Sequence, residues 1–233
     1  MNAIRFVIYT QGRTGSVLLV SLLNQHPHIR CYGELFHPNN WRGPLRSRLF
    51  PIFRRYPILY LQARAIPVRR LTVGFKLLYA QSIATNRPLW KLYNSGWRVI
   101  YLQRRNLLER TLSACMLRIT GISHRSTPIN ENEQIVPVSI EPALFERIWH
   151  KTCQAEHEDQ PLLAQIPHLT LTYEDDLAQS SRWQPTADRV FAYLGLPSAP
   201  VSSGQQKTYS RPYAELISNY ESLVEIARKS GIV

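Results

Sequence analysis

The chain begins with a strand-like run that breaks at a short glycine-containing segment and continues as an amphipathic helix. Residues Ile4–Thr10 are mostly β-branched or aromatic, and Gln11–Ser16 interrupts them with two glycines. The glycines let the backbone turn tightly, and the first N–H groups of the helix point at any anion that lies there. Arg13 and Ser16 add a charged donor and a neutral donor. This order predicts a phosphate- or sulfate-binding loop after the first strand.

The loop differs from the Walker A loop of nucleotide-hydrolysing proteins. That loop has the form Gly-x-x-x-x-Gly-Lys-[Ser/Thr]. Here the spacing between the glycines is shorter, and no lysine follows the second glycine. We therefore expect a phosphate or sulfate ligand without NTP hydrolysis.

Length and composition indicate one globular domain. The chain has 233 residues, of which 44% are hydrophobic, and this is enough for a sizeable core. No stretch reaches the roughly 18 apolar residues of a membrane helix, and the N-terminus lacks a signal-peptide pattern. The three cysteines are too few and too scattered for a disulfide framework. We expect a cytoplasmic protein with reduced thiols.

Positive charge is concentrated in one part of the chain. The formal net charge is +12, and the segment Leu35–Leu108 contains fourteen Lys and Arg residues and no Asp or Glu. Such a field attracts anionic ligands and fits a polyphosphorylated cofactor, an acidic polysaccharide, a lipid surface or nucleic acid. Nonspecific affinity for polyanions is the simplest alternative.

Apolar patterns along the chain alternate between strands and helices, which predicts a parallel sheet with right-handed crossovers. We expect one α/β domain over residues 1–233, with a basic, irregular excursion at 41–70, a surface loop at 123–139 and a C-terminal helical tail at 206–233. The expected strands are Ile4–Tyr9, Val73–Leu77, Arg98–Leu102 and Leu169–Thr172, and the expected helices are Gly15–Gln25, Asn106–Thr120, Ile140–His157 and Thr186–Leu194.

A second anion site is predicted after the third of these strands. Ligands of doubly wound sheets collect beyond the carboxyl ends of the strands. Arg105 follows the strand Arg98–Leu102, and Ser113 lies eight residues further on, about two turns into a helix. Two anion sites indicate a nucleotide with phosphates at both ends.

Three blocks of residues carry a resemblance to the sulfotransferase family. The segment from Tyr9 to Leu19, continued by Asn24–Pro27 and Gly33–Phe36, resembles the family's 5′-phosphosulfate motif. The segment Val99–Ser113 is similar to its 3′-phosphate motif, and Thr172–Leu177 resembles a block of the bacterial and Golgi-type members.

The resemblance implies a P-loop-like α/β domain that transfers a sulfuryl group from 3′-phosphoadenosine 5′-phosphosulfate (PAPS), without an obligatory metal, and releases 3′,5′-bisphosphate adenosine (PAP). The late Arg-Lys-Gly-x-x-Gly block of the cytosolic steroid and phenol enzymes is absent, and Lys207 and Arg211 are expected to serve in its place. The cofactor-binding residues that the resemblance implies are Arg13, Thr14, Gly15, Ser16, Val17, Arg105, Ser113, Lys207 and Arg211.

Glu34 and Lys76 are the expected catalytic residues. Glu34 is the only carboxylate before Glu109, and the similar tyrosyl-protein enzymes place their catalytic glutamate at this point, so it is the candidate general base. Lys76 lies at the end of a predicted strand, where it would point into the same crevice and neutralise the leaving phosphate or the transferring group. It resembles the lysine of a Phe-Lys-Leu segment in bacterial members. The plainer alternatives are a salt bridge for Glu34 and a solvated lysine at a strand end. His26, at a helix end, is a further residue near the expected site.

The expected acceptor is a hydroxyl on a carbohydrate or glycolipid. Arginine at position 13, in place of the lysine of many cytosolic members, is similar to the bacterial lipid and carbohydrate enzymes and to the tyrosyl-protein enzymes. No specific nucleic acid is expected. Contact with an anionic membrane surface through residues 41–70 is compatible with this activity.

Three alternatives remain open, of which one is a membrane-surface protein that would bind anionic lipid through the basic segment Arg42–Arg70. A nucleotide or sugar kinase would bind ATP at the same loop, but a Walker lysine and magnesium-binding acids are missing. A non-catalytic polyanion-binding protein would keep the basic field, show no turnover and lose affinity steeply with salt.

Overall fold

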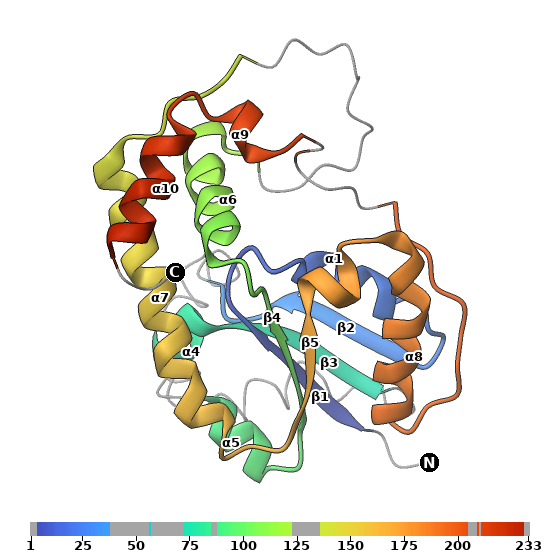
Figure 1. The fold of residues 1–233 in the computed structure, drawn as a ribbon. Helices are drawn as coiled ribbons and strands as arrows, with labels where there is room; N and C mark the ends of the chain where they lie inside the picture. The colour runs from blue at the N-terminus through green and yellow to red at the C-terminus, as the bar shows by residue number, and fades with distance from the viewer. Residues whose placement is uncertain are drawn as a thin grey trace, which may run out of the picture. The chain divides into compact units, whose positions relative to one another are not determined.

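The structure is a computed structural model, and it describes residues 4–37, 56, 72–84, 88–122, 136–204, 209 and 211–230 (Figure 1). The predicted excursion at 41–70, apart from Tyr56, lies outside the described residues, as do most of the predicted loop at 123–139 and Lys207. By internal packing the chain divides into two compact units. The first comprises Met1–Gln103 and Pro161–Ser203, and the second comprises Arg104–Gln160 and Gly204–Val233.

The first unit is built on a five-stranded sheet in which every strand pair is parallel. The spatial order is β2-β3-β1-β4-β5 (Figure 1). The four predicted strands are confirmed, and a further strand, β2, precedes Glu34. The strands are β1 (Arg5–Thr10), β2 (Ile29–Glu34), β3 (Thr72–Leu78), β4 (Arg98–Gln103) and β5 (His168–Thr172).

Both faces of the sheet are apolar, as is expected for a parallel sheet covered by helices. In β1, Phe6 and Ile8 pack on one face with helices α1 (Ser16–Leu23) and α8 (Trp183–Tyr193). Val7 and Tyr9 pack on the other face with α5 (Pro88–Asn94). The predicted α/β class, with a central parallel sheet flanked by helices, is confirmed.

Strand β1 lies at the point where the strand order reverses. The chain leaves β1 through α1 and reaches β2 at one edge of the sheet, whereas β4 and β5 lie on the other side of β1. In open α/β sheets this is where ligands bind, beyond the carboxyl ends of the strands. The loop after β1 therefore occupies the position in the fold that favours ligand binding.

Short helical segments complete the first unit. Helix α4 (Tyr79–Ala84) follows β3 directly, and the π-helical turn η2 (Tyr173–Leu177) follows β5 directly. A 3₁₀ turn, η3 (Ser180–Arg182), leads from η2 into α8. The sheet thus places α4 and η2 at the carboxyl ends of two of its strands.

The second unit is helical and has its own core. It contains α6 (Leu107–Thr120), most of α7 (Pro142–Leu163), α9 (Tyr213–Leu216) and α10 (Tyr220–Lys229). Phe145 and Trp149 stack in this core, and the Trp149 ring N–H donates to the Ser230 hydroxyl at 2.8 Å. The predicted helices at 106–120 and 140–157 and the helical tail are confirmed as elements, whereas a single domain over 1–233 stays a prediction.

Candidate functional site

The loop after β1 has the backbone of an anion cradle. Arg13 and Gly15 both adopt left-handed φ angles, of 67° and 81°. Helix α1 begins at Ser16, and its first intrahelical hydrogen bond runs from the Leu19 N–H to the Gly15 carbonyl at 3.2 Å. The N–H groups before Leu19 have no intrahelical acceptor, as at any helix start, and they carry the positive end of the helix dipole. The tight turn predicted from the glycines is thus present at the start of α1, and its binding of an anion stays a prediction.

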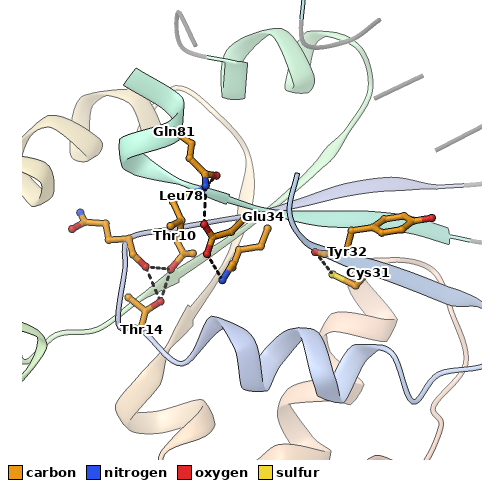
Figure 2. A network of polar contacts seen from close by, with 9 residues as sticks. Thr10, Thr14, Cys31, Tyr32, Glu34, Leu78 and Gln81 are labelled. Carbon is orange, nitrogen blue, oxygen red and sulfur yellow. Dashed lines mark hydrogen bonds and ion pairs between the residues drawn. The ribbon is translucent and has the colours of Figure 1, made fainter. Parts of the chain in front are cut away.

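Two buried hydroxyls hold this loop in shape. The Thr14 and Thr10 hydroxyls lie 2.5 Å apart, and the Thr10 hydroxyl lies 2.7 Å from the Leu102 carbonyl oxygen of the neighbouring strand. The Thr14 hydroxyl also lies 3.1 Å from the Gln11 carbonyl oxygen (Figure 2). Because both threonine side chains are fully buried, the Thr14 side chain serves the loop itself. Any contact of Thr14 with a ligand therefore falls to its backbone N–H.

An aromatic ring supports the loop at Gly15. A Cβ atom at this position would lie 2.7 Å from Cδ2 of Tyr173, the first residue of η2. A side chain would therefore clash with the ring, in addition to the strain of a φ angle of 81°. Gly12, by contrast, has open space where its Cβ would be and is exposed. The second glycine is thus required by tertiary packing as well as by backbone conformation.

Asp176 fixes the η2 turn that carries Tyr173. Its buried carboxylate accepts hydrogen bonds from the Thr172 N–H at 2.6 Å and from the Arg189 guanidinium at 2.6 Å. The Thr186 hydroxyl donates to the Asp176 carbonyl at 2.9 Å. The Thr172–Leu177 block identified in the sequence is therefore a support for the loop after β1.

A β-bulge brings Glu34 to Lys76. Tyr32 pairs with Phe75 and Glu34 pairs with Lys76, so that two steps along β2 correspond to one step along β3. A bulge of this kind shifts the alternation of side chains and turns the last residue of the strand to the opposite face. The Lys76 ammonium and Glu34 Oε1 lie 2.8 Å apart.

Lys76 is buried, with only 6% of its surface exposed, so the alternative of a solvated lysine is wrong. The salt-bridge alternative for Glu34 is confirmed, with Lys76 as the ionic partner, and the role of Glu34 as the general base stays a prediction.

Gln81 completes this group, and the sequence analysis did not select it. Its amide Nε2 donates to Glu34 Oε2 at 2.8 Å, and its Oε1 accepts from the Leu78 N–H at 3.3 Å (Figure 2). Gln81 lies in α4, one turn beyond the end of β3, and no motif marks it. Only the corner between β3 and α4 brings it to Glu34.

At the start of α6, two neighbouring arginines differ in burial, and the sequence does not reveal which of them is buried. Arg104 is buried and contacts Glu109 at 2.5 Å, whereas Arg105 is exposed. Asn106 caps α6 by accepting the Glu109 N–H at 2.9 Å. Ser113 is buried within α6. The structure thus gives Arg104 a structural role, and a phosphate-binding role for Arg105 and Ser113 stays a prediction.

The remaining predicted residues have different environments. Ser16 is buried at the first position of α1, Val17 follows it half-buried, and Arg211 is exposed. His26 is buried: its Nδ1 accepts from the His28 N–H at 3.1 Å, and its Nε2 lies 3.1 Å from the Pro197 carbonyl oxygen. Both ring nitrogens of His26 thus have structural partners.

The three cysteines are buried and free of disulfides. Burial raises the pKa of each thiol, that of Cys115 to about 11, so these side chains are neutral at pH 7. In the described part of the chain, no group of three or more His, Cys, Asp or Glu residues is placed to hold a metal ion. Nor is any helix among the described residues long and apolar enough to cross a membrane.

Comparison with known proteins gives two informative similarities. The chain is 26% identical over 227 residues to nodulation protein H of Rhizobium tropici, covering 94% of this chain and 87% of that protein. The structure resembles the crystal structure of a sulfotransferase from Alicyclobacillus acidocaldarius, with a TM-score of 0.53 and 15% identity, over 99% of this chain and 96% of the other.

A shikimate kinase from Bacteroides thetaiotaomicron is matched less well, with a TM-score of 0.46 and 12% identity over 83% of this chain and 99% of the kinase. No protein-family model matches the chain. The resemblance to the sulfotransferase family carried by the sequence motifs is confirmed, and the chain shares the fold of a sulfotransferase over nearly its whole length.

Proposed function

We propose that this protein transfers a sulfuryl group from PAPS to a hydroxyl of a carbohydrate or glycolipid. One observation carries the proposal: a single edge of the sheet holds an anion cradle after β1, a carboxylate at the end of β2 and a buried lysine near the end of β3. Sulfuryl transfer needs these three groups, because a charged donor must be held, an acceptor deprotonated and a leaving phosphate stabilised.

The residues of the cradle fit the 5′ end of such a donor. PAPS supplies an activated sulfuryl group joined to a 5′-phosphate. The free N–H groups at the start of α1, together with Arg13 and Ser16, offer donors to its oxygens. Val17 contributes a further backbone N–H in the first turn. We assign Arg105 and Ser113 to the 3′-phosphate, and Lys207 and Arg211 to the remainder of the nucleotide.

Glu34 and Lys76 act on different oxygens in the transfer: Glu34 acts on the acceptor hydroxyl and Lys76 on the leaving phosphate. Glu34 accepts the proton of the acceptor hydroxyl while a bond forms between the acceptor oxygen and sulfur. The bond from sulfur to the phosphate oxygen breaks, and Lys76 neutralises the charge that develops there. The products are a sulfate ester and PAP, and the proton on Glu34 returns to solvent. No metal has a role in this scheme.

The acceptor class is supported by Arg13, because an arginine at this place is similar to the bacterial lipid and carbohydrate enzymes, although the tyrosyl-protein enzymes share it. A panel of oligosaccharides and glycolipids, assayed by release of PAP from PAPS, tests it. Transfer to small phenols with none to sugars would contradict the acceptor class while leaving the reaction type intact.

Binding of PAP against 5′-AMP and ATP, measured by calorimetry without magnesium, tests the donor. We expect PAP to bind at least about tenfold more tightly than either competitor, which corresponds to about 1.4 kcal/mol. ATP binding as tight as PAP, or PAP binding that falls with salt without preference for the 3′-phosphate, would contradict the proposal and favour the kinase or polyanion-binding alternatives.

A further inference from the structure

We propose that Gln81 is a positioning residue for the general base, holding the carboxylate of Glu34 from the side opposite Lys76. This inference rests on the proposed function, since it assigns Gln81 a role in the reaction that Glu34 performs. Unlike Glu34 and Lys76, Gln81 belongs to none of the motifs identified in the sequence.

The two oxygens of Glu34 have different partners. Oε1 lies 2.8 Å from the Lys76 ammonium, and Oε2 accepts the Gln81 amide N–H at 2.8 Å. Two contacts on different oxygens fix the rotation of a carboxylate, which one contact cannot do.

The orientation of the Gln81 amide follows from its second contact. The Leu78 N–H is a donor and lies 3.3 Å from one end of the amide, which must therefore be the oxygen. The NH₂ end then faces Glu34 (Figure 2). Gln81 is only 9% exposed, so little water competes for these bonds.

One corner of the chain supplies both partners of the base. Lys76 lies in β3, and Gln81 lies five residues later in α4, with no residue between the two elements. The lysine neutralises charge, whereas the neutral amide holds the carboxylate without adding a second cation. The difference predicts that Gln81 affects the rate of transfer and leaves donor binding unchanged.

The substitution Gln81→Met tests the role, because methionine has a similar size and cannot donate. We expect kcat for release of PAP from PAPS, with the best acceptor of the panel, to fall about tenfold, with the KM for PAPS and the affinity for PAP unchanged. Gln81→Asn, whose amide is one methylene too short to reach Glu34, should give a similar loss and serves if the methionine variant does not fold.

Gln184→Met is the matched control. The Gln184 amide donates to Asp188 at 3.0 Å and accepts from the Val201 N–H at 2.9 Å, which are contacts of the same kind in α8. This variant should lower the urea midpoint of unfolding and leave kcat unchanged. Equal losses of kcat in the two glutamine variants would overturn the positioning role.

A double-mutant cycle of Gln81→Met with Glu34→Met, which removes both acceptor oxygens, separates this inference from the proposed function. We expect the loss in the urea midpoint for the double variant to be smaller than the sum of the single losses. Additive losses would mean that Gln81 does not hold Glu34. If the unsubstituted protein transfers no sulfuryl group, the proposed function fails, and the cycle still decides whether Gln81 positions the carboxylate.

Discussion

The carboxyl edge of the sheet and the start of α6 carry the two predicted phosphate sites, and they are built differently. At the sheet edge, Thr14 and Lys76 are buried, and they contact the side chains of Thr10 in β1 and Glu34 in β2. At the start of α6, the buried arginine is Arg104, and the residue assigned to the ligand, Arg105, is exposed. The first site is fixed by packing before any ligand arrives, whereas the second presents a long side chain to solvent.

The difference predicts which substitutions should lower both function and stability. A substitution at the sheet edge removes a group that the fold itself uses, so function and stability should fall together. A substitution of Arg105 should weaken one contact with the nucleotide and leave the fold intact.

Glu34→Gln should have the largest effect. Turnover should fall about a thousandfold, because glutamine cannot accept a proton at neutral pH, while PAP affinity stays nearly unchanged. Stability should also fall by about 1–3 kcal/mol, because the buried Lys76 loses its ionic partner. Steady-state kinetics and urea unfolding measure the two effects. Glu146→Gln, at an exposed position of α7, is the control; unchanged turnover of Glu34→Gln would remove Glu34 as the base.

Gly15→Ala should disrupt the cradle. The new Cβ meets the Tyr173 ring at 2.7 Å and sits on a left-handed backbone, which together cost about 2–3 kcal/mol of stability. PAP affinity should fall with it, as measured by calorimetry. Gly12→Ala is the matched control, because its Cβ would meet open space. Equal effects of the two alanine variants would mean that the Tyr173 ring does not define the loop.

Asp176→Asn tests whether the η2 turn holds the loop after β1 in shape. An asparagine cannot accept hydrogen bonds at both of its ends, so one of the contacts with Thr172 and Arg189 is lost, at a cost of about 2 kcal/mol. We expect a lower urea midpoint and a modest loss of PAP affinity. Asp175→Asn, at the exposed neighbouring position, should change neither. If the Asp176 variant is clearly destabilised but keeps full PAP affinity, the η2 turn does not support the cradle.

Arg105→Ala should have the smallest effect and the most selective one. We expect PAP to bind about tenfold more weakly, with 5′-AMP affinity and the unfolding midpoint unchanged, because an exposed side chain is removed from one phosphate contact. Arg118→Ala, an exposed arginine near the end of α6, controls for general loss of positive charge. Equal losses for both nucleotides would remove the 3′-phosphate assignment of Arg105.

The sequence was sufficient for the fold class and for most of the strands and helices. Alternating apolar runs and helical spacing are local signals, and the run Arg98–Gln103 or the capped helix starting at Leu107 can be recognised from its neighbours alone. Strand β2, which ends at Glu34, is not among the four strands that the apolar pattern predicts. Its alternation is broken by the bulge, which depends on pairing with β3 and leaves no local pattern.

Within the candidate site, motif and position predicted the loop, Glu34 and Lys76, while environments could not be predicted. The sequence offered Arg104 and Arg105 side by side, and burial against Glu109 distinguishes them. It offered His26 near the site, and bonds to His28 and Pro197 give that ring a structural role. In each case the deciding partner comes from packing that the residue's own segment does not reveal.

The sequence by itself determined the order of strand, glycine loop and helix, the strong positive charge and the resemblance to sulfotransferases, because these are properties of neighbouring residues. The tertiary structure decided that Tyr173 lies against Gly15, that a bulge turns Glu34 to Lys76, and that Gln81 holds the other carboxylate oxygen. These contacts join residues far apart in the chain, and only the folded sheet brings them within hydrogen-bonding or van der Waals distance.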